Sequence, residues 1–283
     1  RSAGMKTIGF IDYFLDEWHA NRYPEWIAQA SDGRMRVAYA WAAKDADNGL
    51  SNLAWCEKNG VQWVDSVEAV VEKSDFLVVL SPDHPEQHER LAELALSSGK
   101  PVYVDKTFAP DRATAIRMFE RAERHGTPMY STSALRYAEE YAQAAKDGIA
   151  VIHSVGPGKY DNYSIHQIEP IVSLMGPDAR RVMAIGNEAS PALLYEFSDG
   201  RQALIRLFGW ECPFTLTVQY NSGNAAVLTP KSDFFAPFIR DMVRFFETGQ
   251  PTVDPRETIA VITMIEYGFR ALQNPYRWVD LPA

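Results

Sequence analysis

Cysteine is scarce in this chain of 283 residues, which contains only two. Cys56 and Cys212 lie in separate predicted domains, and neither belongs to a C-x-x-C pair. The sequence therefore argues against a disulfide framework and against a zinc knuckle. It fits a reducing compartment, and we expect a cytoplasmic protein.

Long apolar runs and an excess of positive charge are also missing. No run of about 18 apolar residues could span a bilayer, and no basic segment followed by an apolar stretch marks a secretory signal. The 37 acidic residues outnumber the 28 Lys and Arg residues, which gives a formal net charge of −9. This balance argues against nucleic acid and against an anionic membrane as partners. A small-molecule ligand is expected instead.

Strands and helices alternate in the first part of the chain. The run Phe76–Leu80 is apolar throughout, as in a parallel strand covered on both faces, and Ser81 begins the polar turn after it. A helix with one apolar stripe follows, and then the strand Pro101–Val104. This βαβ pattern predicts an α/β fold with a doubly wound parallel sheet over residues 5–131.

The pattern changes after Ala134. Strand-like runs between residues 150 and 230 are joined by short turns such as Ser198–Gly200, which is typical of antiparallel neighbours. One helix interrupts these strands and two more follow them. Residues 132–283 are therefore predicted to form an α+β domain with a mixed or antiparallel sheet.

Lys106 is the first candidate for catalysis. Ligands of open α/β sheets bind outside the carboxyl ends of the strands, so Ser81–His84 and Asp105–Thr107 are expected to line one crevice. A partly buried lysine in that crevice can donate a hydrogen bond or proton to a substrate oxygen. The alternative is a surface lysine paired with Asp105 or Asp111.

His166 and Glu169 form the second catalytic candidate. Residues three apart share a helix face, so the carboxylate can orient the imidazole for acid–base chemistry. The alternative is a solvated histidine at a polar helix terminus. We expect Lys106 and His166 to face one interdomain cleft.

Polar and aromatic residues near these candidates suit a hydroxyl-rich ligand. The guanidinium of Arg136 offers several fixed donors, although an interdomain salt bridge is an equal alternative. The residues before His166 suit stacking on a sugar ring, although a turn has a similar composition. The predicted substrate-binding residues are Arg136, Tyr137, Tyr160, Asn162 and Tyr163. No metal site is expected near His84 and His88, because no third ligand has suitable spacing.

Five segments, in order, resemble motifs of the glucose-fructose oxidoreductase/inositol dehydrogenase (Gfo/Idh/MocA) family. They match its T-P-N-x-x-H turn, its strand ending in E-K-P, its G-x-H-x-x-D segment, its L-x-G helix end and its closing pair of helices. Ser164 and Glu169 stand where the family has glycine and aspartate. The segments are Ser81–Asp83 with His88, Gly99–Thr107, Asn162–Glu169, Leu174–Gly176, and Phe238–Arg240 with Gly249, Pro251 and the helix after Asp254.

This resemblance implies an oxidoreductase that moves a hydride between NAD or NADP and a CH–OH carbon of a sugar- or cyclitol-like substrate. It implies a Rossmann-like first domain, with Lys106 beside the nicotinamide and the reacting carbinol. It also implies a homo-oligomer formed through the second sheet. The cofactor-binding residues are then Gly9, Ile11, Asp12, Ser81, Pro82, Asp83, His88 and Asp105.

The first turn departs from the family's G-x-G-x-x-G pattern, whose glycines admit the pyrophosphate. With Gly9 as the first glycine, Ile11 and Phe14 take the other two positions. Asp12, with Asp16 and Glu17, adds negative charge there. We therefore expect weaker NAD(P) binding than with an intact loop. The alternative is a non-redox lyase or isomerase, or a binding protein, that keeps the fold but has lost the dinucleotide.

Overall fold

The computed structural model describes residues 4–283, which form two compact units. The first unit runs to Thr132 and also contains residues 236–255. The second unit contains Ser133–Phe235 and Arg256–Ala283. The sequence had placed the whole of 132–283 in one domain, whereas the chain returns to the first unit before it ends in the second.

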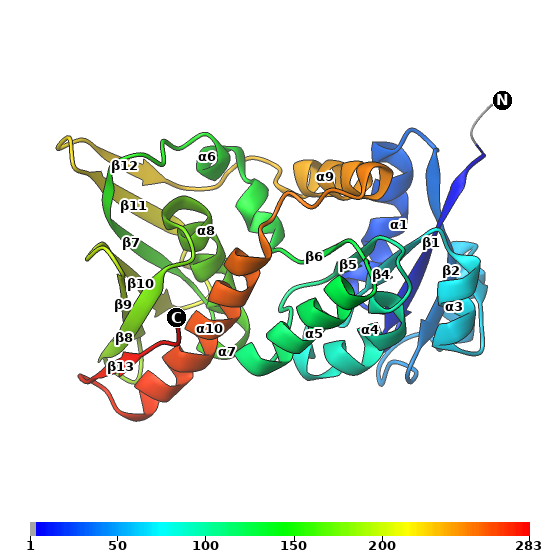
Figure 1. Cartoon of the computed structure of the whole chain (residues 1–283), viewed down its shortest axis with the longest axis horizontal. Helices are drawn as coiled ribbons and strands as arrows, with labels where there is room; N and C mark the ends of the chain where they lie inside the picture. The colour runs from blue at the N-terminus through cyan, green and yellow to red at the C-terminus, as the bar shows by residue number, and fades with distance from the viewer. Residues whose placement is uncertain (1–3) are drawn as a thin grey trace. The chain divides into compact units, whose positions relative to one another are not determined.

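A six-stranded parallel sheet organises the first unit (Figure 1), as the βαβ pattern predicted. The strand order is β3-β2-β1-β4-β5-β6. The chain adds β2 and β3 on one side of β1 and then β4, β5 and β6 on the other side. The boundary between β1 and β4 is thus a topological switch point, which is where α/β sheets generally bind ligands. The strands are β1 (Lys6–Asp12), β2 (Met35–Ala42), β3 (Gln62–Trp63), β4 (Phe76–Val79), β5 (Val102–Val104) and β6 (Met129–Tyr130).

Helices cover this sheet, with α1 packed on β2, α3 on β1, and α4 on β4 and β5. Ser51, Ser66 and Asp111 each cap a helix by accepting a hydrogen bond from a backbone N–H group. Pro24 lies inside α1, which continues through it as one helix. The helices are α1 (Trp18–Ala30), α2 (Asn52–Asn59), α3 (Val67–Lys73), η1 (Pro85–Gln87), α4 (His88–Leu96) and α5 (Arg112–Arg124).

Helix α9 (Phe235–Thr248) explains why residues 236–255 belong to the first unit. Its Phe246 ring stacks on Phe76 with centroids 4.9 Å apart, and its Phe238 ring meets Tyr103 edge-on at 5.6 Å. Large aromatic surfaces contribute strongly to a core when they are buried together. The tertiary partner of α9 is thus a sheet more than 100 residues earlier, which local sequence patterns do not reveal.

A seven-stranded mixed sheet organises the second unit, in the order β12-β11-β7-β10-β9-β8-β13. Strands β7 and β10 run parallel, and their other neighbours run antiparallel. A mixed sheet was one of the two predicted forms. The strands are β7 (Ile149–Pro157), β8 (Ala179–Gly186), β9 (Pro191–Phe197), β10 (Gln202–Phe208), β11 (Thr215–Tyr220), β12 (Ala225–Leu228) and β13 (Trp278–Asp280).

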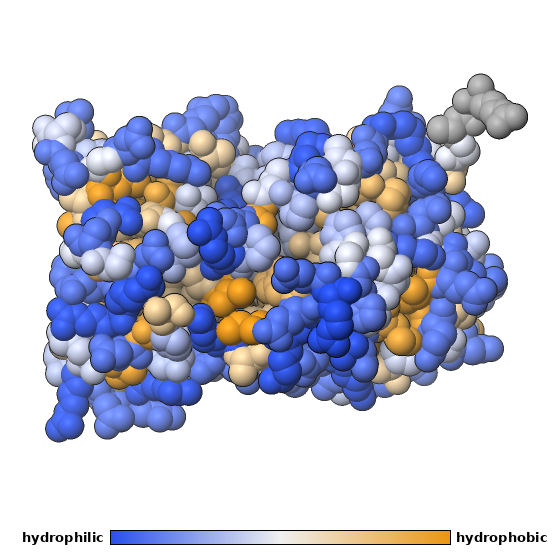
Figure 2. Space-filling model, viewed as in Figure 1, coloured by the Kyte–Doolittle hydropathy of each residue, from blue (hydrophilic) through white to orange (hydrophobic). Residues whose placement is uncertain are grey.

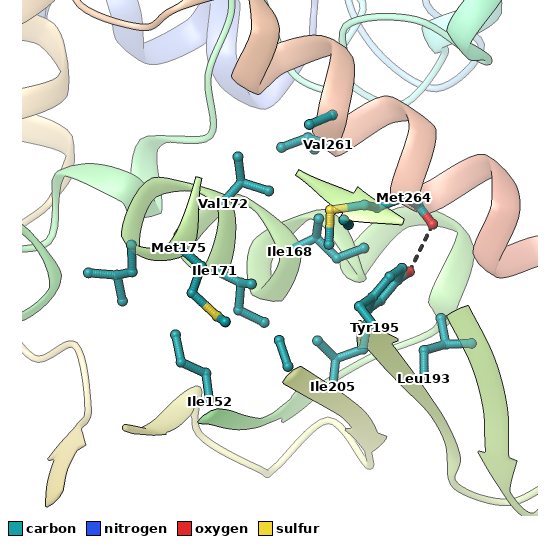
Figure 3. Packing of buried hydrophobic residues seen from close by; sticks show 14 of the residues in the cluster. Ile152, Ile168, Ile171, Val172, Met175, Leu193, Tyr195, Ile205, Val261 and Met264 are labelled. Atoms are coloured by element: carbon teal, nitrogen blue, oxygen red, sulfur yellow. Dashed lines mark hydrogen bonds between the residues drawn. The ribbon is translucent and has the colours of Figure 1, made fainter. Parts of the chain in front are cut away.

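The core of the second unit lies between this sheet and two helices, α8 and α10 (Figure 3). Ile168 and Val172 of α8 are fully buried, as is Met264 of α10. The hydroxyl of Tyr195 on β9 donates a 2.8 Å hydrogen bond to the Met264 carbonyl, which satisfies a buried polar group. The helices are η2 (Ala134–Tyr137), α6 (Glu139–Ala142), α7 (Tyr160–Tyr163), α8 (Ile165–Met175) and α10 (Pro255–Gln273).

Hydrophilic residues cover most of the face drawn in Figure 2, with smaller apolar patches between them. Among residues 4–283, no helix has the length and apolar character needed to cross a membrane.

Candidate active site

The carboxyl ends of β1 and β4 are joined through Asp12. Its Oδ1 accepts hydrogen bonds from the backbone N–H groups of Tyr13 (2.7 Å) and Ser81 (2.9 Å). Ser81 has a φ of 64°, in the left-handed region that non-glycine residues seldom adopt, and this bond helps to hold it there. Burial, with a smaller contribution from Glu17, raises the pKa of Asp12 well above its usual value. The buried Asp12 carboxyl therefore connects the ends of these two strands.

The buried His88 side chain holds the same turn in place. Its Nδ1 lies 2.9 Å from the Phe108 carbonyl oxygen, and its Nε2 lies within hydrogen-bond distance of the Leu80 and Ser81 carbonyl oxygens. The side chain has no exposed surface, and burial lowers its pKa. The expected cofactor contact of His88 is therefore corrected to a structural role, because a ligand cannot reach the ring. Of the other predicted turn residues, Pro82 is buried and Asp83 is exposed.

Lys106 follows β5 at this edge of the sheet. The Asp105 N–H donates to the Val79 carbonyl at 2.8 Å, which holds the segment beside the end of β4. The Asp105 carboxylate accepts a 2.8 Å hydrogen bond from the Tyr103 hydroxyl. Lys106 is partly exposed, and within residues 4–283 it forms no ion pair with Asp105 or Asp111. The alternative, a surface lysine paired with Asp105 or Asp111, does not agree with the structure of these residues.

Glu17 and His19 lie at the start of α1. The Glu17 carboxylate caps the helix by accepting hydrogen bonds from the N–H groups of His19 (2.7 Å) and Ala20 (2.8 Å). One of its oxygens is also 3.3 Å from His19 Nδ1, and His19 Nε2 is 3.7 Å from an Asp105 oxygen. Burial lowers the pKa of His19, but Asp105 and Glu17 together outweigh it, so the pKa is raised. The role of His19 was missed, although an acid two residues before a histidine at a helix start was a visible signal.

The residues at this helix terminus do not fit a pyrophosphate. A dinucleotide in a Rossmann fold places its phosphates on the free N–H groups and positive dipole of the first helix. Here the Glu17 carboxylate takes the N–H groups, and Asp12 lies beside it. The Asp16 carboxylate accepts the Leu50 N–H at 2.8 Å in the same turn. Three carboxyl groups, and no basic side chain, are thus what these contacts place where two phosphates would have to bind.

The expected place of Gly9 and Ile11 in the turn is corrected by the structure. Both residues lie inside β1, which continues to Asp12, and Ile11 is fully buried. A Cβ atom at Gly9 would come within 2.4 Å of Val70 and within 2.3 Å of Ser74. Gly9 therefore permits close packing of β1 against α3 rather than the approach of a phosphate. The turn itself begins after Asp12.

His166 lies in the first turn of α8 in the second unit. Its Nδ1 is 3.2 Å from the Ser133 hydroxyl, and its ring contacts the rings of Tyr163 and Phe214 at centroid distances of 5.1 and 5.9 Å. The side chain is partly exposed. The contact with Ser133 was not predicted, because the two residues lie 33 positions apart.

Arg136 holds two carboxylates of the second unit. Its Nε donates to Glu169 at 2.9 Å and its Nη1 donates to Glu257 at 3.0 Å. The Arg136 side chain is 13 % exposed, and that of Glu169 is 4 % exposed. Burial lowers the pKa of Arg136, but the two carboxylates raise it by more, so the net shift is upward. The Glu169 carboxylate is thus bound to Arg136, and the predicted orientation of His166 by Glu169 stays a prediction.

An aromatic cluster continues from the Tyr163 ring, which contacts His166. The Tyr163 ring meets the Trp210 ring edge-on at 4.8 Å and stacks parallel to Phe214 at 6.4 Å. Trp210, in the turn between β10 and β11, is 60 % exposed. A large exposed ring in contact with Tyr163, which itself contacts His166, is suited to the CH face of a sugar. Trp210 and Phe214 were not predicted, because strand and turn residues offer no local signal for this contact.

Tyr160 belongs to the core rather than to a ligand site. It is 8 % exposed, and its hydroxyl donates to the Ile265 carbonyl at 2.6 Å. A Cβ atom at Gly268 would come within 2.0 Å of that hydroxyl, so glycine is needed for α10 to approach. The substrate-binding prediction for Tyr160 is corrected on this ground. Asn162 is exposed and Tyr137 is partly exposed, so both keep surface for a ligand.

Residues 27–132 match the model of an oxidoreductase family with an NAD-binding Rossmann fold (GFO_IDH_MocA). A search of curated proteins found no match.

Solved structures with the same fold cover nearly the whole chain. GenD2 from gentamicin A biosynthesis, solved in complex with NAD, is 16 % identical with a TM-score of 0.81, and the match covers 100 % of this chain and 98 % of GenD2. A myo-inositol 2-dehydrogenase from Lactobacillus plantarum is 16 % identical with a TM-score of 0.79, covering 98 % and 100 %. A scyllo-inositol dehydrogenase from Lactobacillus casei, solved with NAD(H) and scyllo-inositol, is 15 % identical with a TM-score of 0.77, covering 98 % and 99 %. The family model covers only part of the first unit, whereas these structures share the fold of both units.

Proposed function

We propose that this protein, whose residues 27–132 match the model of the Gfo/Idh/MocA oxidoreductase family, is an enzyme acting at a CH–OH or ketone carbon of a sugar- or cyclitol-like molecule. The observation that carries this proposal is the position of Lys106. It follows a central strand at the ligand-binding edge of the sheet, is partly exposed, and forms no ion pair within residues 4–283. Its amino group is thus available to a substrate oxygen.

Lys106 and His166 divide the proton transfers in this proposal. Reaction at a carbinol or beside a ketone requires one group to exchange a proton and another to stabilise charge on oxygen. The Ser133 hydroxyl, 3.2 Å from Nδ1, helps to orient the His166 imidazole. Tyr163 and Trp210 supply apolar surface for a sugar ring. The two catalytic candidates lie in different units, and their common cleft stays a prediction.

One form of the proposal is hydride transfer with NAD or NADP. The family match supports it, as do structural neighbours whose titles name inositol dehydrogenases and bound NAD(H). The nicotinamide nucleotide would supply the hydride chemistry. The chain's own residues would bind the substrate and move its protons.

The other form is non-redox chemistry, such as elimination or isomerisation on a sugar-derived ketone. The Glu17 cap favours this form, because it fills the helix terminus that a dinucleotide needs. Both forms use the same acid–base residues.

Product analysis separates the two forms. Purified protein would be incubated with a panel of polyols and keto-sugars, with and without added NAD(P), and the products followed by mass spectrometry. Oxidation or reduction that depends on nucleotide supports hydride transfer, and loss of water or isomerisation without nucleotide supports the non-redox form. No turnover of any member, by a protein that binds these sugars, would contradict both forms and leave a binding protein.

Trp210 is expected to contribute to substrate binding. An aromatic contact is worth about 0.5–1.5 kcal/mol beyond the area it buries, so Trp210→Ala should raise KM by about 2- to 10-fold with a smaller change in kcat. Trp210→Phe should restore most of the affinity. Val227→Ala, which removes an exposed apolar side chain from β12 in the same unit, is the control and should leave KM unchanged. An unchanged KM in Trp210→Ala would remove the sugar-stacking role.

We also propose a cytoplasmic location and a homo-oligomer formed through the sheet of the second unit. Cys56 and Cys212 are both free thiols, which is consistent with a reducing compartment. Light scattering on the purified protein tests the assembly, and a monomer at micromolar concentration would contradict it.

A further inference from the structure

A carboxylate of the protein itself, that of Glu17, lies at the start of α1. Helix N-termini attract anions because their first N–H groups are unpaired and the helix dipole is positive there. In this chain both oxygens of the Glu17 carboxylate bond to those N–H groups, at 2.7 and 2.8 Å. The Glu17 side chain is 8 % exposed. A nearly buried carboxylate thus occupies the position that phosphate oxygens take in a dinucleotide-binding Rossmann fold.

Neighbouring side chains keep Glu17 in this position. His19 Nδ1 is 3.3 Å from a Glu17 oxygen, and His19 Nε2 is 3.7 Å from Asp105, which is itself held by Tyr103. The charged and titratable groups facing His19 are Glu17, Asp105, Lys106 and the Tyr23 ring, 5.5 Å away. Two carboxylates around one imidazole favour its cationic form. The imidazolium then lies at ion-pair distance from the Glu17 carboxylate.

Two buried oxygens in the same place have no hydrogen-bond partner among residues 4–283. They are Oδ2 of Asp12 and Oδ2 of Asp105, and both side chains are almost completely buried. An unpaired buried oxygen acceptor costs free energy unless a donor reaches it. The Asp105 oxygen lies 3.7 Å from His19 Nε2, beyond hydrogen-bond distance, so a hydroxyl or ammonium donor would satisfy it and a second anion would not. The partly exposed Lys106 is the next residue along the chain from Asp105.

We infer that Glu17 occupies the pyrophosphate site of this Rossmann fold with the chain's own carboxylate, locked by His19. The edge of the sheet beside Lys106 then takes an uncharged, hydroxyl-bearing ligand and excludes a dinucleotide. This inference rests on the first unit alone, so it stands whether or not Lys106 and His166 share a site.

Anion binding tests the inference directly. The probes are inorganic pyrophosphate, NADH and NADPH, titrated by calorimetry into the full chain. The unmodified protein should bind none of them below millimolar concentration. Glu17→Ser keeps a residue that caps helices but removes the carboxylate, so it should tighten pyrophosphate binding at least about 10-fold. Glu25→Ser, which removes an exposed carboxylate from the same helix, is the matched control and should not create binding.

The interaction between His19 and Glu17 is tested by an NMR titration of His19 in the folded protein. Loss of the neighbouring carboxylate in Glu17→Ser should lower the pKa of His19, and the resonance is assigned by its absence in His19→Gln. Tight binding of NADH or NADPH by the unmodified protein would overturn the inference. So would a Glu17→Ser variant that folds, keeps the His19 pKa unchanged and still binds no pyrophosphate. Neither result depends on turnover, so both are distinguishable from failure of the proposed enzyme activity.

Discussion

Lys106→Met is expected to lower kcat by on the order of 10²-fold or more, the usual scale for a positioned acid or base. The amino group forms no ion pair within the described part of the chain, so its loss leaves no carboxylate uncompensated. The fold should therefore persist, as circular dichroism and thermal melting can show. Lys58→Met, at an exposed lysine of the same unit, is the matched control and should retain full turnover.

His166→Ala should lower kcat by a similar factor, with His153→Ala at an exposed position of the same unit as its control.

The double variant tests the predicted common cleft. Residues that act together in one reaction are strongly non-additive, so Lys106→Met with His166→Ala should be little slower than either alone. Near-normal turnover in both folded single variants would remove the catalytic assignment. Fully multiplicative losses would place the two residues in separate steps or sites.

Arg136→Met is expected to destabilise the second unit by about 3–5 kcal/mol, the usual result of removing one partner of a buried ion pair. The reason is that the Glu169 carboxyl, only 4 % exposed, would stay buried without the guanidinium that compensates it. Chemical denaturation with a probe in the second unit measures this change. Its midpoint should fall well below that of the unmodified protein.

A surface ion pair in the same unit supplies the control. Arg180 and Asp178 are 3.2 Å apart, with side chains 38 % and 57 % exposed. Exposed pairs contribute about 0–1 kcal/mol, so Arg180→Met should shift the midpoint little. If Arg136→Met were as mild as Arg180→Met, and weakened substrate binding instead, the predicted substrate role of Arg136 would replace the structural one.

The sequence by itself determined that the first sheet is parallel and that Lys106 follows one of its strands, and it left the second sheet as mixed or antiparallel. Apolar runs such as Phe76–Leu80 indicate buried parallel strands, and the turns between them are local features. The residue that follows a strand is read directly from the chain, so Asp105 and Lys106 could be placed at the carboxyl edge of the first sheet. The acidic character of the first turn was equally visible in Asp12, Asp16 and Glu17.

Only the tertiary structure decided what those side chains bond to. Charge alone did not show that Glu17 would cap α1, since that depends on where the turn after β1 ends. The turn had been expected to start at Gly9, whereas β1 continues to Asp12 and Gly9 allows close packing against Ser74.

Long-range packing decided the rest, because hydrogen bonds and ring contacts form between residues distant in the chain. Arg136 meets Glu257 across 121 positions, and Phe246 of α9 packs on Phe76 of the first sheet. The Trp210 ring, in the turn between β10 and β11, contacts the Tyr163 ring. Periodicity and capping patterns act over a few residues and carry no signal of such partners, which are selected by the shape and polarity of the folded core.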